Sequence, residues 1–123
     1  KGPPPVDWTY GYSPEDVACL ERGRAALEIG RHDESLAEFA AILERKPGDN
    51  ASVLFSGIAK ARQGDLDGAI NLWKMFLDFD KLRIQRELNV LIALCETGDR
   101  PEPLAAAQSV EQAIADQEAG RGV

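Results

Sequence analysis

Residues 54–64, LFSGIAKARQG, decide the fold because three of their positions recur at a spacing of 34 residues. The glycine column is Gly30, Gly64 and Gly98. Two further columns keep the same step: Leu20, Leu54 and Leu88, and Ala25, Ala59 and Ala93. A fixed period of this length indicates one supersecondary unit stacked on copies of itself. We therefore expect an array with a long exposed face and no deep enclosed pocket.

Glycines and capping residues divide the chain into six expected helices. Gly30, Gly64 and Gly98 each suit the left-handed residue that follows a helix. Helix starts are predicted at the capping side chains Ser13, Asp33, Asn50 and Asp67. The expected helices lie near residues 14–29, 33–46, 50–63, 67–80, 82–97 and 101–119. The predicted fold class is all-α: a helical-repeat solenoid of three antiparallel helix pairs, with repeats at about 16–49, 50–83 and 84–117.

The fourth and sixth expected helices differ in their apolar patterns. Apolar side chains cover most of the fourth helix: Ile70, Leu72, Trp73, Met75, Phe76, Leu77 and Phe79. This is too much apolar surface for a helix with one solvated face, so we expect it in the middle of the stack. The sixth helix carries one narrow stripe: Leu104, Ala107, Val110 and Ile114. We expect it to be the terminal cap, whose outer face is polar.

Residues 1–12 form an extended N-terminal arm before a single predicted domain at 13–119, and 120–123 is predicted to be a flexible tail. A proline triplet at 3–5 favours the polyproline conformation. Four apolar residues then alternate with polar ones, which places them on one side: Val6, Trp8, Tyr10 and Tyr12. These four are candidate contacts. The arm either lies on the first helix pair or occupies a groove of its own or of a second copy.

The repeating unit resembles the tetratricopeptide repeat family, a helix–turn–helix of 34 residues, over roughly residues 16–115. The matching positions are Cys19, Gly23, Ala26, Ser35, Phe39 and Pro47, then Val53, Gly57, Ala69 and Trp73. Gly23 and Gly57 are expected to let the paired helix approach closely. In the third unit Leu91 replaces this glycine and Pro103 stands where a small residue would pack. We therefore expect the last pair to pack with a shifted crossing angle.

The resemblance implies a concave groove, lined by the first helix of each pair, in which partners dock. Its predicted residues are Leu20, Arg24, Leu27, Leu54, Ile58, Arg62, Leu88 and Ile92. Such an apolar strip suits an amphipathic helix or an extended apolar peptide. The alternative is that the leucines simply pack against the neighbouring helix, and the sequence leaves both interpretations open.

Family relatives suggest what the groove binds. Some co-chaperones of this family clamp the C-terminal carboxylate of heat-shock chaperones with a lysine, arginine and asparagine cluster. The comparable places here carry Leu20, Arg24, Phe55, Gln85 and Asn89, which do not make that clamp. Three-repeat chaperones of bacterial type III secretion, which hold apolar client segments, are a closer analogy. The resemblance therefore implies a non-catalytic adaptor or chaperone-like module; the alternative is a scaffold that self-associates through its repeats or its arm.

Composition argues against several other functions. The net charge of −7 and pI near 4.7 oppose binding to nucleic acid or an anionic membrane. The longest apolar run, at 90–95, is far shorter than the roughly 20 residues that cross a bilayer, so we expect no membrane insertion in this segment. His32 is the single histidine, which gives no metal cluster and no activated cysteine nucleophile. We predict no catalysis, no metal and no cofactor.

Cys19 and Cys95 fall in the first and third units. Stacked helices lie about 8–10 Å apart, so two units exceed the roughly 7 Å between Cα atoms that a disulfide tolerates. Free thiols favour a reducing compartment such as the cytoplasm. Because the chain begins at Lys1 without an initiator methionine, we expect an excerpt or a processed product. A periplasmic or membrane-tethered location, through a segment upstream of Lys1, is the alternative.

Overall fold

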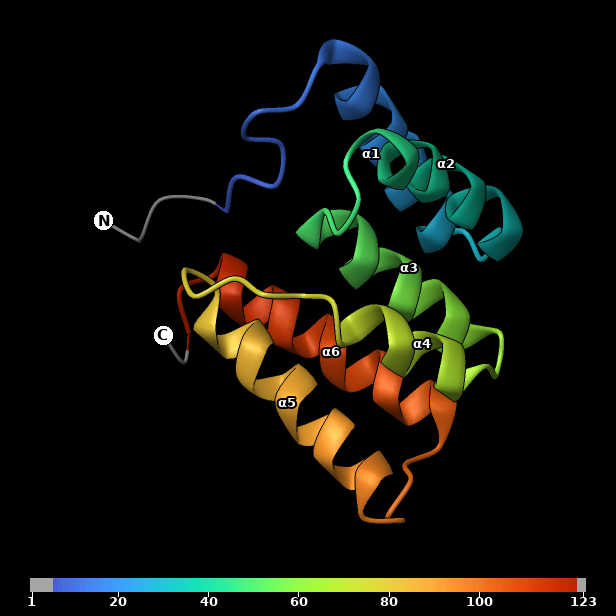
Figure 1. Ribbon diagram of the computed structural model, residues 1–123, viewed down its shortest axis with the longest axis vertical. Helices are drawn as coiled ribbons and strands as arrows, with labels where there is room; N and C mark the ends of the chain where they lie inside the picture. The colour runs from blue at the N-terminus through green and yellow to red at the C-terminus, as the bar shows by residue number, and fades with distance from the viewer. Residues whose placement is uncertain (1–5, 122–123) are drawn as a thin grey trace.

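The computed structural model describes residues 6–121, and this part of the chain contains six α-helices and no strand (Figure 1). The helices are α1 (Pro14–Glu28), α2 (His32–Arg45), α3 (Asn50–Arg62), α4 (Leu66–Trp73), α5 (Leu82–Glu96) and α6 (Pro103–Glu118). The all-α prediction is confirmed. The predicted polyproline stretch at 3–5 and the last two residues of the predicted tail lie outside the described residues.

The three recurring glycines end helices as predicted. Each stands two residues after the end of α1, α3 or α5. Their φ angles are 80° at Gly30 and 87° at both Gly64 and Gly98, in the left-handed region that glycine adopts without strain. In all three turns the N–H of the residue after the glycine donates to the carbonyl five residues earlier, at 2.9 Å. The 34-residue period is therefore repeated in the turn geometry.

Helix starts follow the predictions less closely. Ser13 caps α1 as predicted, since its Oγ accepts a hydrogen bond from a first-turn backbone N–H at 3.1 Å. Asp49 caps α3 at 3.0 Å, and Asp65 caps α4 at 2.8 Å. The predicted caps at Asn50, Asp67 and Asp33 are wrong, because all three lie inside the first helical turn. Adjacent polar residues offer similar capping oxygens, so sequence alone does not choose between them.

The fourth helix is shorter than predicted and ends at Trp73. The side-chain amide of Asn50 holds the chain that follows, with Nδ2 donating to the Leu77 carbonyl and Oδ1 accepting from the Leu77 N–H, both at 2.9 Å. This clamp ties the connecting segment 74–81 to the start of α3. Met75, Leu77 and Phe79 are 51%, 63% and 72% exposed. The predicted extent of the fourth helix, residues 67–80, is therefore wrong, although α4 itself contacts both α3 and α5.

The central helix is α3, which packs against α1, α2, α4 and α6 (Figure 1). Residues 51–59 are all buried. The sixth helix lies against both α3 and α5, with small residues in the contact: Ala106, Ala107 and Ala113. α5 is the outer helix at this end and packs mainly on α6. The prediction of α6 as the terminal cap is therefore wrong, since its alanines let helices approach on two sides.

Two close helix contacts depend on glycine. Gly23 of α1 lies against the ring of Phe39 in α2, and Gly57 of α3 lies against the indole of Trp73 in α4. A Cβ atom at either glycine would overlap the ring. The predicted close approach is confirmed within the first two pairs. Both cysteines are free thiols, as expected. Among the described helices, none combines the length and hydrophobicity that crossing a bilayer requires.

Candidate functional site: a cleft between α1 and α6

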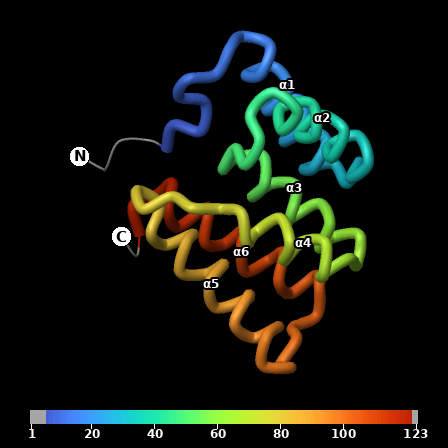
Figure 2. Tube along the Cα trace, in the orientation of Figure 1, coloured from blue at the N-terminus to red at the C-terminus, as the bar shows by residue number. Residues whose placement is uncertain are grey.

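A cleft of about 720 Å³ separates α1 from α6. Figure 2 shows α3 running between the α1–α2 hairpin and α6, so α3 forms the floor. The apolar lining residues are Ala25, Leu27, Phe55, Ile58, Ile114 and Ala115. The charged lining residues are Glu21, Arg24, Glu28, Arg62, Glu111 and Glu118. Gly30, in the turn after α1, and His32, the first residue of α2, complete the lining. The cleft therefore has an apolar floor between two helical walls that carry charged side chains.

Half of the predicted groove residues line this cleft: Arg24, Leu27, Ile58 and Arg62. Of these, Ile58 is a core side chain, 1% exposed. Leu20, Leu54 and Leu88 are buried in the core instead. Ile92 is half-buried on α5, outside the cleft. A surface groove lined by the leucine column is thus wrong, because all three side chains belong to the buried core.

Sequence reasoning missed the α6 wall and its acidic residues. Glu21 and Glu28 stand seven residues apart on α1, and Glu111 and Glu118 repeat this spacing on α6. Seven residues are about two helical turns, or about 10.5 Å, so each pair lies on one face of its helix. The seven-residue spacing was a signal available in the sequence. No signal in the sequence indicated the placement of α6 against α3, which brings the two glutamate pairs to opposite walls of the cleft.

The cleft's two arginines are held in different ways. Arg62 of α3 makes a two-point ion pair with Glu111 of α6, with one Nε–Oε2 distance of 2.9 Å. This hydrogen bonding raises the pKa of the Arg62 guanidinium and ties α6 to the central helix. The guanidinium of Arg24 lies 4.4 Å from the centroid of the Phe55 ring, a cation–π contact. Within residues 6–121, no carboxylate lies within ion-pair distance of Arg24.

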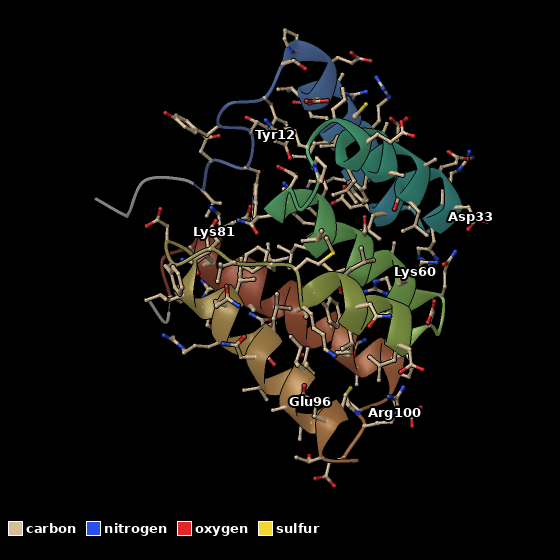
Figure 3. All side chains as sticks on the ribbon, in the orientation of Figure 1. Tyr12, Asp33, Lys60, Lys81, Glu96 and Arg100 are labelled. Carbon is tan, nitrogen blue, oxygen red and sulfur yellow. The ribbon has the colours of Figure 1, made fainter. Side chains whose placement is uncertain are left out.

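Trp8 of the arm contacts two residues that line the cleft, Phe55 and Glu118. Its ring meets Phe55 edge to face, with centroids 5.3 Å apart. Its indole N–H donates to Glu118 Oε2 at 3.2 Å, and Lys81 Nζ lies 5.2 Å from the ring. Figure 3 shows Tyr12 and Lys81 on the same side of the molecule. Trp8 thus links the arm to α3 and to the adjacent ends of α5 and α6.

The remaining arm residues depart from the predicted extended strip. The chain turns at Tyr10 and Gly11, where the Tyr12 N–H donates to the Thr9 carbonyl at 2.9 Å. The turn leaves Tyr10 89% exposed, while Val6 and Tyr12 are half-buried. The prediction that all four candidate contacts lie on one face of the arm is therefore wrong. The arm crosses the start of α3, and its contacts come chiefly from Trp8 and Tyr12.

Tyr12 is anchored to the start of α3. Its hydroxyl donates to Asp49 Oδ2, and Lys46 Nζ lies 5.7 Å from its ring centroid. Partial burial raises the pKa of the Tyr12 hydroxyl well above its ordinary value, and the hydrogen bond to Asp49 raises it further. The neutral phenol is thus the form that the folded chain holds.

A pH dependence follows from Tyr12. Since its pKa is raised on folding, its stabilising contribution is complete below about pH 10 and is lost as the pH rises toward the folded pKa. Urea titrations at increasing alkaline pH should show the free energy of unfolding falling in wild type and in Tyr10→Phe. Tyr12→Phe should show a smaller fall. If the free energy of unfolding fell equally with pH in both variants, Tyr12 would not be the group responsible for the pH dependence.

The described residues contain no group of three or more histidine, cysteine or acidic side chains arranged to hold a metal. The glutamates line the cleft two turns apart and do not converge on one point. The geometry offers apolar contact along a floor and hydrogen-bond acceptors along both walls. Comparisons with family models, with characterised proteins and with solved structures give no match.

Proposed function

We propose that this chain is a non-catalytic protein-binding module, a tetratricopeptide-like helical array that holds a partner segment between α1 and α6. The observation that carries the proposal is the cleft itself, with an apolar floor along α3 and polar walls on two helices. A groove of this kind suits an amphipathic helix, whose apolar face lies on the floor. The relation to tetratricopeptide repeats rests on the 34-residue columns and on the three matching turns.

An enzyme is the less favoured interpretation on geometric grounds. Acid–base catalysis needs ionisable groups within hydrogen-bond reach of one reacting position. The cleft's carboxylates are spread along two helices, and Glu111 is engaged by Arg62. His32, the first residue of α2, lines the cleft beside them. These groups are better placed to contact several points along a bound chain.

A second candidate function is self-association, as a structural scaffold. Its support is the connecting segment 74–81, where Met75, Leu77 and Phe79 are largely exposed. Exposed apolar side chains close together favour association with another surface. Light scattering after gel filtration decides this candidate: a concentration-dependent dimer that Phe79→Ser abolishes would support it. A monomer at all concentrations would reject it.

Peptide selection tests the leading proposal without assuming a partner. Displayed peptides selected on the wild-type chain should shift backbone amide resonances in α1, α3 and α6. Ala115→Trp should weaken their binding about tenfold or more, or roughly 1.4 kcal/mol, because Ala115 is exposed inside the cleft. Ala40→Trp, on an exposed position of α2, is the matched control and should bind normally. Equal affinity for both variants would overturn the proposal.

A further inference from the structure

We infer that the segment held between α1 and α6 is a basic amphipathic helix, an inference that rests on the proposed function. The cleft's charge is the first argument. Its lining carries four glutamates against two arginines. Arg62 is committed to Glu111, so Glu21, Glu28 and Glu118 face the cleft with Arg24 as the single remaining cation among its described lining residues. Cationic side chains on the occupant would complement this excess.

The spacing of the glutamates is the second argument. Each wall presents two carboxylates about two turns apart. A helix laid along the cleft repeats its own side chains with the same rise, so lysines or arginines seven residues apart would reach both members of a wall pair. Its apolar stripe would then meet Leu27, Phe55 and Ile114. The occupant is therefore apolar along one face and basic on both flanks.

The arm supplies the third argument, because Trp8 already contacts two residues that line the cleft. Its apolar ring packs on Phe55, and its N–H donates to Glu118. This is the chemistry proposed for the partner, an apolar group on the floor beside a donor on a wall carboxylate. Trp8 also lines a second hollow of about 700 Å³, together with Val6 and Tyr12 among others.

Three synthetic helical peptides test the inference. They share one leucine and alanine face and carry lysine, glutamine or glutamate at the flanking positions. Calorimetry should give the tightest binding for the lysine peptide, about tenfold weaker binding for the glutamine peptide and none for the glutamate peptide. Raising the salt above about 0.15 M should weaken the lysine peptide alone. Amide shifts in α1, α3 and α6 report whether each peptide occupies the cleft.

Matched charge variants locate the effect. The cleft variant is E21Q/E28Q/E118Q, and the control is E44Q/E96Q/E102Q, which removes three exposed carboxylates outside the cleft. Glu96 lies at the end of α5 far from Lys81 (Figure 3). The cleft variant should bind the lysine peptide at least tenfold more weakly, and the control should retain wild-type affinity. Glutamine preserves an acceptor for Trp8, so the arm contact survives in the cleft variant.

The outcomes separate the two proposals. Equal cleft binding of the lysine and glutamine peptides would overturn the basic partner while supporting a cleft that binds helices. Equal weakening in both triple variants would also overturn it, because the attraction would then follow the net charge of −7 alone. A different result would contradict the proposed function itself. Peptides would then bind Ala115→Trp as tightly as wild type, and no amide resonances in the cleft would shift.

Discussion

Leu54→Glu and Leu88→Glu should each unfold the chain. Both side chains are completely buried, Leu54 in the central helix and Leu88 in α5. An ionised carboxylate in an apolar interior without a partner costs several kcal/mol, even after local rearrangement. A small domain has about 5–15 kcal/mol of stability, so either change removes much or all of it. Far-ultraviolet circular dichroism and urea denaturation should show loss of helix or a strongly lowered midpoint.

The same substitution at an exposed leucine is the control. Leu104→Glu in α6 places the carboxylate at a side chain that is 50% exposed, and its effect should stay within about 0.5 kcal/mol. This comparison decides between a leucine groove and a leucine core. Full helicity and an unchanged urea midpoint for Leu54→Glu would restore the groove predicted from the period.

The ends of α1, α3 and α5 could be predicted from sequence because their determinants are local. A glycine in the left-handed region stops a helix through the backbone of its own turn, so Gly30, Gly64 and Gly98 mark their sites directly. The contacts of Gly23 and Gly57 with aromatic rings were also predictable. Each joins two adjacent helices of one pair, within 16 residues of sequence. Short connections limit where the second helix can lie.

The features that could not be predicted from the sequence depend on contacts between residues far apart in the chain. The early end of α4 depends on Asn50, which binds the backbone of Leu77 across 27 residues. The α6 wall of the cleft rests on buried side chains such as Val110 and Ile114. It also rests on an ion pair between Arg62 and Glu111, which are 49 residues apart. Apolar periodicity identifies the faces that are buried without naming the helix that covers them.

The leucine column illustrates this limit. A repeat period shows that Leu20, Leu54 and Leu88 occupy equivalent positions, yet equivalence does not distinguish a concave surface from a core. The cleft instead involves Arg24, on the next turn of α1, and Phe55, the neighbour of Leu54. The step from Leu54 to Phe55 turns the side chain by about 100°, yet Phe55 is also buried, at 3% exposed, so the period alone does not show which side chains reach the surface.

Gly57→Ala should destabilise the chain although alanine normally stabilises a helix interior by about 1 kcal/mol relative to glycine. An added Cβ would overlap the indole of Trp73, which is completely buried. Moving that ring also disturbs its hydrogen bond to the Leu54 carbonyl, at 3.1 Å. Overpacking and a disturbed buried hydrogen bond together predict a loss of about 3 kcal/mol by urea denaturation.

Replacing the ring isolates this contact. Trp73→Leu alone should cost about 3 kcal/mol, because it leaves a cavity against α3. In the double variant Gly57→Ala/Trp73→Leu, the new methyl group occupies part of that space and no longer meets an indole. The double variant should therefore be more stable than the sum of the two single changes predicts, by about 1 kcal/mol or more. Coupling energies between residues in contact are typically about 0.5–3 kcal/mol. Simple additivity would show that Gly57 and Trp73 act independently and that the close contact between α3 and α4 does not require a glycine.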